Sequence, residues 1–200
     1  MTWQNLIWVA RHRAWTPSYL VRYWRLARLR RRHPDVVAEG LVFIGRDVEI
    51  FARSGYGRVV LGKWVHLGDG TKLRAHEGTL RVGDKAVFGG SVVVNCLLDI
   101  EIGAACLVGD WVYVCDFDHV TTDPRVPIKD QGVVKSPVRI GPDCWLGTKA
   151  SVLKGSMIGR GSVLAAHTVV RGEVPDHSVV AGVPGRVRHR RRGREDRTSA

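Results

Sequence analysis

The sequence has no apolar run of about 18 residues, the length that a helix needs to cross a membrane. It also lacks the uninterrupted apolar core of a signal peptide, because Arg11 and Arg13 follow closely on the apolar residues 7–10. We therefore predict no transmembrane helix and expect a cytoplasmic protein, with association at a membrane surface as an open option.

Cysteine and histidine do not occur in the spacings that metal sites use. The four cysteines (96, 106, 115 and 144) form no CxxC pair, and the histidines are scattered along the chain. A zinc site needs closely spaced ligands, such as two histidines on adjoining turns. We predict no metal, and in a reducing compartment the cysteines should stay reduced.

Composition is that of a folded globular chain. The 200 residues are 44% hydrophobic and 25% charged, which suits one sizeable domain. The net charge of +12 is uneven, because basic residues crowd the first 32 and the last 15 positions. Such clusters favour anionic partners, namely phosphates, a lipid surface or nucleic acid.

From Leu41 onward, apolar residues recur every six positions, and glycine commonly follows them. A small or β-branched residue often stands four places after the apolar one, so three positions keep one register over many repeats. The apolar series contains Ile44, Ile50, Leu61, Leu67, Leu73, Val82, Phe88, Val94, Ile102, Val108, Val114, Ile140, Leu146, Val152, Ile158, Leu164 and Val170.

A period of six is too short for helix pairs and suits short extended segments that turn a corner every six residues. Three segments make one triangular coil, and stacked coils form parallel strands about 4.8 Å apart with the apolar series pointing inward. The predicted fold is all-β, a parallel β-helix. We expect glycine to supply backbone freedom at the corners.

Two departures from the period predict where the chain leaves the regular coil. The spacing from Val82 to Ile102 is twenty, so two residues should bulge out within VNCLLDIE. The spacing from Val114 to Ile140 is twenty-six, which we interpret as an excursion of eight residues beyond one coil. Insertions on one face of a repeat array usually mark its binding face, so this loop is the candidate functional site.

His119 lies at the root of the loop, beside Asp116 and Asp118, and Asp99 lies about one coil earlier. An imidazole with a pKa near 6.5 accepts a proton at neutral pH, and a carboxylate can orient it. His119 is therefore the predicted general base, with the three carboxylates as residues that orient it or bind an acceptor. The alternative is a solvated loop histidine.

The cysteines favour structural roles. Cys106 and Cys144 take the small inward position of their repeats and are expected in the core. Cys115 lies four residues before His119, which leaves a Cys–His nucleophile as an alternative mechanism.

Three segments are predicted. Residues 1–40 form a basic amphipathic helical segment, in which Pro17 suits the first turn of a second helix. This segment either covers the open end of the solenoid or lies on an anionic membrane. Residues 41–187 form the β-helix domain. Residues 188–200 form a basic tail that we expect to be disordered and that lacks the interleaved aromatics of a nucleic-acid-binding segment.

The periodic array, the histidine-bearing loop and the ending CWLGTKASVLKGSMIGRGSVLAAHTVVRGEVPDHSVVAGVPGRV together resemble the left-handed β-helix O-acetyltransferases. The resemblance spans about residues 41–189. Within a group that includes the galactoside and maltose enzymes, it is closest to actinobacterial polysaccharide O-acyltransferases. It implies a left-handed coil, acyl-coenzyme A as co-substrate, a homotrimer and a saccharide acceptor.

The resemblance also implies roles for individual residues. His119 matches the family's catalytic base, and Trp145 matches the tryptophan beside the coenzyme A groove. Asn95 joins the three carboxylates as a residue that orients the base or binds the acceptor. Arg171-Gly172 stands where the family often has Thr-Lys, and Arg171 is expected to substitute in that contact with the cofactor. The remaining cofactor-binding positions are Gly147, Thr148, Ala166 and Arg186.

The predicted reaction transfers a short acyl group, acetyl or succinyl, from acyl-coenzyme A to a hydroxyl of a saccharide or polysaccharide in a ternary complex. The residues that hold the sugar in galactoside enzymes fall here on Ala75, Gly89 and Leu97, whose side chains cannot form those hydrogen bonds. A simple galactoside is therefore not the expected acceptor. The alternatives are an N-acyltransferase on an amino sugar or amino acid, and a non-catalytic β-helix that serves as a scaffold or binding module.

Overall fold

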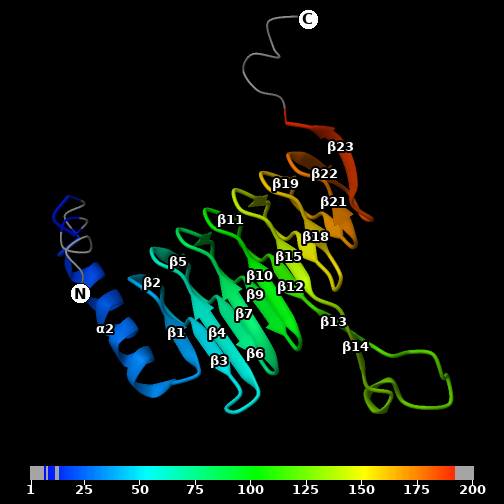
Figure 1. The fold of residues 1–200 in the computed structure, drawn as a ribbon, viewed down its shortest axis with the longest axis horizontal. Helices are drawn as coiled ribbons and strands as arrows, with labels where there is room; N and C mark the ends of the chain where they lie inside the picture. The colour runs from blue at the N-terminus through cyan, green and yellow to red at the C-terminus, as the bar shows by residue number, and fades with distance from the viewer. Residues whose placement is uncertain (1–6, 8, 12–13, 192–200) are drawn as a thin grey trace, which may run out of the picture.

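The computed structural model describes residues 7, 9–11 and 14–191. Short strands joined by tight corners wind into a parallel β-solenoid, with helix α2 (Pro17–Arg32) across its N-terminal end and a hairpin projecting from one side (Figure 1). This architecture confirms the predicted parallel β-helix and agrees with the left-handed coil that the resemblance implies. Within the described ranges, no helix is long and apolar enough to cross a membrane.

Three sheets form the three faces of the solenoid, and their strands run parallel except for β23 at the end of face B. Face A consists of β1 (Val36–Ala38), β4 (Gly57–Leu61), β7 (Gly78–Val82), β10 (Asp99–Ile102), β15 (Val138–Ile140), β18 (Met157–Ile158) and β21 (Glu173–Val174). Face B consists of β2 (Val42–Ile44), β5 (Val65–Leu67), β8 (Val87–Phe88), β11 (Leu107–Val108), β16 (Trp145–Leu146), β19 (Val163–Leu164), β22 (Ser178–Ala181) and β23 (Arg186–Arg190). Face C consists of β3 (Glu49–Ala52), β6 (Lys72–Ala75), β9 (Val93–Cys96), β12 (Tyr113–Cys115), β17 (Ser151–Val152) and β20 (Val169–Val170).

The strand register stacks the apolar series of one coil on that of the next. On face A, Val82 pairs with Ile102 and Ile102 pairs with Ile140. Every member of the series is buried, with at most 7% of its surface exposed. Each fully buried Val, Leu or Ile contributes about 1.5–3 kcal/mol, so the predicted inward ladder is the main source of stability. Cys106 and Cys144 are buried in this core as predicted.

The glycines that follow the apolar residues have a different purpose from the predicted one. A Cβ at Gly68 would lie 2.3 Å from the carbonyl oxygen of Gly89 in the next coil. The left-handed backbone of the corners falls two residues after such glycines, for example at Trp111 (φ 62°) and Lys149 (φ 60°). These glycines are therefore required because successive coils approach too closely for a side chain, not for backbone freedom. The predicted backbone freedom does apply to other corner glycines, such as Gly70 (φ 71°) and Gly161 (φ 67°).

The projecting segment is longer than the spacing suggested. Strand β10 pairs directly with β15, which places Ile102 against Ile140. The twenty-six residues from Val114 to Ile140 therefore comprise one ordinary step of six and an excursion of twenty. The predicted excursion of eight was wrong, because it assumed that one more coil lay within the loop.

The excursion forms an antiparallel hairpin. Its strands are β13 (Phe117–His119) and β14 (Val133–Lys135), and its loop contains the short 3-10 helix η1 (Ile128–Asp130). We call residues 117–135 the hairpin. Figure 1 shows it leaving the solenoid after β12 and extending away from the stacked coils.

Helix α2 packs across the open end of the first coil. It begins with Thr16 as its N-cap and Pro17 in its first turn, as predicted. Leu26 is buried on its inner side, and Tyr19 and Tyr23 meet the buried ring of Phe43 in β2. This packing agrees with the end-covering role that the sequence left open.

Two arginines of α2 satisfy backbone acceptors of the first coil. The Arg25 guanidinium donates to the carbonyl oxygen of Ile44 at 3.0 Å. Arg30 donates to the carbonyl oxygens of Ala38 and Gly40 at 3.0 and 2.7 Å. An open sheet edge presents unpaired backbone groups, so these arginines protect the solenoid end rather than only being solvated.

The solenoid extends past the predicted 41–187 at both ends. Strand β1 begins at Val36 and pairs with β4, and β23 lies antiparallel on β22 up to Arg190. The start of the predicted disordered tail is thus a strand that covers the last edge of face B. Residues 192–200 lie outside the described residues, as does most of the predicted first helix, of which residues 7 and 9–11 are helical.

Candidate active site

His119 stands at the edge between faces C and A, where the chain leaves β12 to enter the hairpin. It ends β13, pairs with Val133 of β14 and is exposed. The ring of Phe117 meets its imidazole edge-on, with ring centroids 6.3 Å apart. In the described part of the chain, no side chain hydrogen-bonds to the imidazole, so the ring is open to a substrate or to another chain.

Asp116 is a buried carboxylate that holds the base of the hairpin. Its oxygens accept hydrogen bonds from the backbone N–H groups of Leu97, Leu98 and Asp99, each at 2.8 Å. The thiol of Cys96 lies 3.4 Å from this carboxylate. Burial, and after it the charge of Asp116, raises the pKa of Cys96 to about 12. Asp116 therefore fixes the corner between β9 and β10 against the strand that leads to His119.

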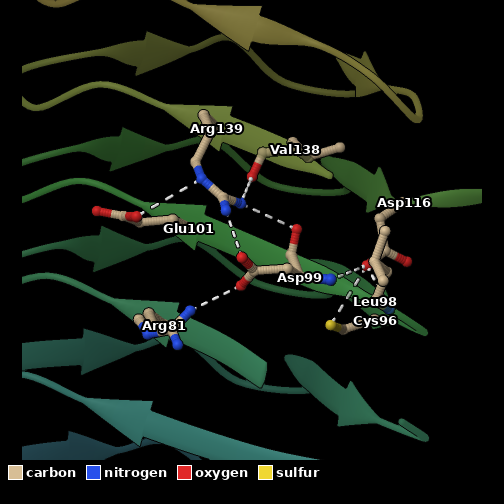
Figure 2. A network of polar contacts seen from close by, with 8 residues as sticks. All are labelled: Arg81, Cys96, Leu98, Asp99, Glu101, Asp116, Val138 and Arg139. Carbon is tan, nitrogen blue, oxygen red and sulfur yellow. Dashed lines mark hydrogen bonds and ion pairs between the residues drawn. The ribbon is translucent and has the colours of Figure 1, made fainter. Parts of the chain in front are cut away.

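The backbone N–H of Asp99 donates to Asp116, but the Asp99 side chain lies on the sheet that forms face A. Figure 2 shows the carboxylate between Arg81 and Arg139, which come from the coils on either side. Arg81 donates to it at 2.6 Å, and Arg139 also binds the Asp99 carbonyl oxygen at 3.1 Å. The sequence placed Asp99 beside the hairpin, and the structure gives it a role in holding the corner.

Asp118 lies on the opposite face of β13 from Phe117 and His119, because side chains alternate along a strand. Arg171 donates to its carboxylate at 2.6 Å, and Lys154 lies 3.8 Å from the same oxygen. On the other strand, Lys135 pairs with Glu77 and lowers the pKa of that carboxyl. The hairpin base is thus tied to the coils on both sides.

Asn95, Tyr113 and Cys115 lie on face C next to the hairpin base, and Asn95 pairs with Cys115 in the register. Burial raises the pKa of the Tyr113 phenol, against the opposing effect of a hydrogen bond with Asn95. Burial also raises the pKa of the Cys115 thiol. A thiol that is kept protonated is a poor nucleophile, so the Cys–His alternative finds no support. Sequence reasoning missed Tyr113. Because Val114 points inward and side chains alternate along a strand, the sequence could have indicated that Tyr113 points outward, next to the hairpin base.

A second group of predicted residues lies along face B. Trp145 stands between Leu107 and Val163 on the outer side, and the exposed fractions of Trp145 and Leu107 are 54% and 53%. Thr148 and Ala166 are exposed on neighbouring coils at the edge between faces B and C. Gly147 is buried, and a Cβ there would meet the Ala166 nitrogen at 2.6 Å, so its requirement is close packing of the coils.

Positive charge lies at the C-terminal end of the same face. Arg186 pairs with Ala181 at the start of β23, and all five residues of that strand are exposed. We call Leu107, Trp145 and Val163 the apolar stripe. An apolar stripe that ends in cations fits the chemistry of coenzyme A, which joins a pantetheine arm to phosphates. Arg171 does not belong to this group, because it lies at the edge after face C and pairs with Asp118.

The two groups lie on different edges of the triangular solenoid. His119 is at the edge between faces C and A, whereas Thr148 and Ala166 are at the edge between faces B and C. Face C separates the base from the face B stripe within one chain. A second chain whose C–A edge approached this B–C edge would bring the two groups together. Over the described residues, no group of three His, Cys, Asp or Glu side chains could hold a metal ion.

Comparisons with known proteins place the chain in a family. The model of the bacterial transferase hexapeptide (six repeats) matches residues 137–172. The chain is 54% identical over 187 residues to a probable acetyltransferase of Mycobacterium tuberculosis (strain ATCC 25618 / H37Rv), covering 94% of this chain and 62% of that protein. It is 30% identical over 139 residues to a protein of Escherichia coli (strain K12) named for O-acetyl transfer in lipopolysaccharide biosynthesis, covering 66% of this chain and 71% of that protein.

The chain therefore belongs to the hexapeptide-repeat transferase family, and it spans about three fifths of the length of its mycobacterial relative. Galactoside acetyltransferase in complex with coenzyme A has the same fold, with a TM-score of 0.58, 19% identity and coverage of 81% of this chain and 68% of that chain. A mutant of the N-acyltransferase AntD from Bacillus cereus, in complex with dTDP and coenzyme A, gives a TM-score of 0.61, 16% identity and coverage of 86% and 92%. At these identities the likeness establishes the fold alone.

Proposed function

We propose that this protein transfers a short acyl group, acetyl or succinyl, from acyl-coenzyme A to a hydroxyl of a saccharide or polysaccharide. The observation that carries the proposal is the position of His119 at the root of the long excursion from the otherwise regular solenoid. Family membership and the O-acetyl transferase name of the E. coli relative favour this reaction class. Because acyl-coenzyme A is made inside cells, we propose that the reaction is cytoplasmic.

His119 acts as general base in this proposal. Its imidazole takes the proton of the acceptor hydroxyl as the oxygen attacks the thioester carbonyl. A tetrahedral oxyanion forms, and backbone N–H groups near the hairpin or at Thr148 stabilise it. The carbon–sulfur bond then breaks, and the imidazolium returns the proton to the leaving thiolate. No acyl-enzyme is formed, which suits the buried, protonated thiol of Cys115.

We propose that the site lies between neighbouring chains of a homotrimer. Within one chain, face C separates His119 from the apolar stripe that ends at Arg186. Trp145 and Leu107 are exposed on that stripe, so a pantetheine arm laid along it would cover apolar surface. The cations of β23 would then meet the phosphates. Each site would take its base from one chain and its stripe from the next.

The acceptor would meet His119 on face C. Asn95 and Tyr113 are the polar side chains beside the hairpin base that can hydrogen-bond a sugar hydroxyl. Asp116 and Asp99 support this surface from below, since their carboxylates are bound to backbone amides and to arginines. Asp118 positions the hairpin through Arg171.

Replacing His119 by Ala tests the proposal. The expected result is a loss of about 10²–10⁴-fold in acyl transfer, the usual contribution of a general base, with unchanged affinity for coenzyme A. His33→Ala is the matched control, because His33 is an exposed histidine far from the hairpin in sequence. Unchanged turnover in His119→Ala, or a burst of free coenzyme A with acyl label on Cys115, contradicts the mechanism.

N-acyl transfer is the second candidate, because the AntD N-acyltransferase shares the fold. The same base would then deprotonate an amine of an amino sugar or amino acid. Mass spectrometry of saccharides, amino sugars and amino acids incubated with several acyl-coenzyme A donors distinguishes the two. Acylation at nitrogen alone overturns the O-acyl proposal. A non-catalytic scaffold would show no rise in thermal midpoint with acyl-coenzyme A.

A further inference from the structure

Helix α2 has two faces of different chemistry. The inner face packs on the first coil, where Leu26 is buried and Tyr19 and Tyr23 contact Phe43. Covering the solenoid end explains that face. It does not explain the outer face, because a terminal cap needs only a polar surface toward solvent.

Large apolar side chains occupy the N-terminal half of the outer face. Leu20, Val21 and Trp24 share one side of the helix by their spacing, and Trp15 immediately precedes the N-cap. Their exposed fractions are 56% for Leu20, 45% for Val21, 59% for Trp24 and 56% for Trp15. Tryptophan beside aliphatic residues on an exposed helix is typical of a surface that enters the boundary region of a lipid bilayer.

Arginine occupies the C-terminal half of the same face. Arg28 and Arg31 follow Trp24 at helical spacing, Arg32 ends the helix, and the Arg28 guanidinium lies 5.4 Å from the Trp24 ring centroid. The sequence contains eight arginines and no Asp or Glu before Asp35. The positive charge of this segment is therefore not balanced within it, and phosphate groups are its natural complement.

We propose that the α2 outer face (Leu20, Val21, Trp24, Arg28, Arg31 and Arg32) binds an anionic phospholipid surface. The apolar half enters the headgroup region and the arginines pair with lipid phosphates. Helix α2 lies at the end of the stacked coils (Figure 1), and all six side chains of this face are exposed. This inference does not depend on the proposed acyl transfer.

Two other occupants fit the face less well. A second copy of the chain would present the same arginines, with Asp47 as the one carboxylate in the pocket that Trp24, Arg28 and Arg32 line. Like charges across such an interface repel. An acidic polysaccharide supplies negative charge but no apolar phase for Leu20, Val21 and Trp24. Lipid supplies both, because its phosphates lie directly above the acyl chains.

Sedimentation of the full chain with vesicles tests the proposal. Vesicles of phosphatidylcholine with phosphatidylserine should bind the protein, salt should weaken the binding, and vesicles of phosphatidylcholine alone should bind little. The triple variant Arg28→Gln, Arg31→Gln, Arg32→Gln should weaken binding roughly a hundredfold. The double variant Leu20→Ser, Trp24→Ser should weaken it at least about tenfold.

A matched control lies on the corner between β3 and β4. There the Arg53 guanidinium lies 4.4 Å from the ring centroid of the exposed Tyr56, the same kind of pair as Arg28 and Trp24. The variant Arg53→Gln, Tyr56→Ser should bind vesicles like the wild type. Acyl transfer to a soluble acceptor should be unchanged in all these variants, so a failure of lipid binding is separable from a failure of the proposed function.

Equal sedimentation of the wild type and the triple variant, with matching thermal midpoints, overturns the proposal. So does equal binding to neutral and anionic vesicles. If the outer-face variants leave vesicle binding unchanged but lower the mass of the sedimenting species in sedimentation velocity, the face is a contact between copies of the chain. The lipid proposal is then wrong. Retention on dextran sulfate without binding to vesicles refutes it in the same way.

Discussion

The solenoid and the hairpin are held by different kinds of interaction. Each coil of the solenoid buries its apolar residues against the coils above and below, so its stability is a sum of many similar contacts. The hairpin lies outside that stack. Its base depends on a small set of polar anchors, namely the Asp116 carboxylate and the pairs Glu77–Lys135 and Asp118–Arg171.

This difference separates stability from function. Core contacts repeat, so a change in one coil lowers the stability of the whole stack. Polar anchors are few and local, so a change at the hairpin base should move His119 while leaving the stack folded. Asp116 is the exception, because its carboxylate is buried between the two regions.

The largest effect is expected where the two regions meet. Asp116→Ala leaves the backbone N–H groups of Leu97, Leu98 and Asp99 without their acceptor. An unsatisfied buried group costs about 1–3 kcal/mol, and these three hydrogen bonds are partly buried. The free energy of unfolding should therefore fall by about 2–3 kcal/mol in urea denaturation. Asp110→Ala is the control, because this exposed carboxylate accepts one hydrogen bond, from the Gly90 N–H. Its loss should lower the free energy of unfolding by less than about 1 kcal/mol. Equal losses would refute the anchoring role.

A smaller loss should follow from a side chain between two coils. Gly68→Ala places a Cβ 2.3 Å from the Gly89 carbonyl oxygen, and overpacking of this kind costs about 1–3 kcal/mol. Gly90→Ala is the matched control, because its nearest neighbour would be the Asp69 carbonyl oxygen at 3.4 Å. Thermal or chemical unfolding should separate the two variants, and similar stabilities would show that close approach does not select glycine.

The hairpin anchors should respond in the opposite way. Arg171→Gln breaks a partly exposed ion pair with Asp118, which contributes about 0.2–1 kcal/mol to stability. Global stability should hardly change, whereas acyl transfer should fall several-fold and proteolysis within residues 120–132 should become faster. Arg125→Gln, which breaks a pair inside the loop, is the control. A weaker affinity for coenzyme A in Arg171→Gln would instead restore the cofactor-binding role predicted from sequence.

The smallest effect is expected from pH. Lys135 lowers the pKa of Glu77 below its ordinary value of 4.5 in the folded protein. A lowered folded pKa means that the pair stabilises the hairpin above pH 4.5 and that this stabilisation is lost as pH falls through the folded pKa. Hydrogen-exchange protection of Val133–Lys135 should therefore decrease below pH 4.5 in the wild type. Glu77→Gln should show lower protection with no such pH dependence, and identical profiles would refute the anchor.

The repetitive part of the fold could be read from the sequence because its determinant is local. Apolar residues six apart indicate which side chains point inward, and all of them are buried. The place of His119 at the break in the period was predicted for the same reason. The length of the break could not be predicted, because spacing alone does not say that Ile102 pairs with Ile140.

The polar partners also lay beyond the sequence. Asp99, Asp116 and Asp118 stand near His119 in the chain, yet they bind arginines and backbone amides from other coils. Arg171 was assigned to the cofactor and pairs with Asp118. Such partners are chosen by residues far apart in sequence, which only the stacking of coils brings together.

The sequence by itself determined the solenoid, its inward ladder and the point where the hairpin leaves it, because a fixed period dictates burial residue by residue. Only the tertiary structure decided why glycine follows the apolar residues, since the clash of Gly68 with Gly89 exists only between stacked coils. It also decided that His119 lies at the edge between faces C and A whereas Trp145 lies on face B, because the triangular path sets which face or edge each segment reaches.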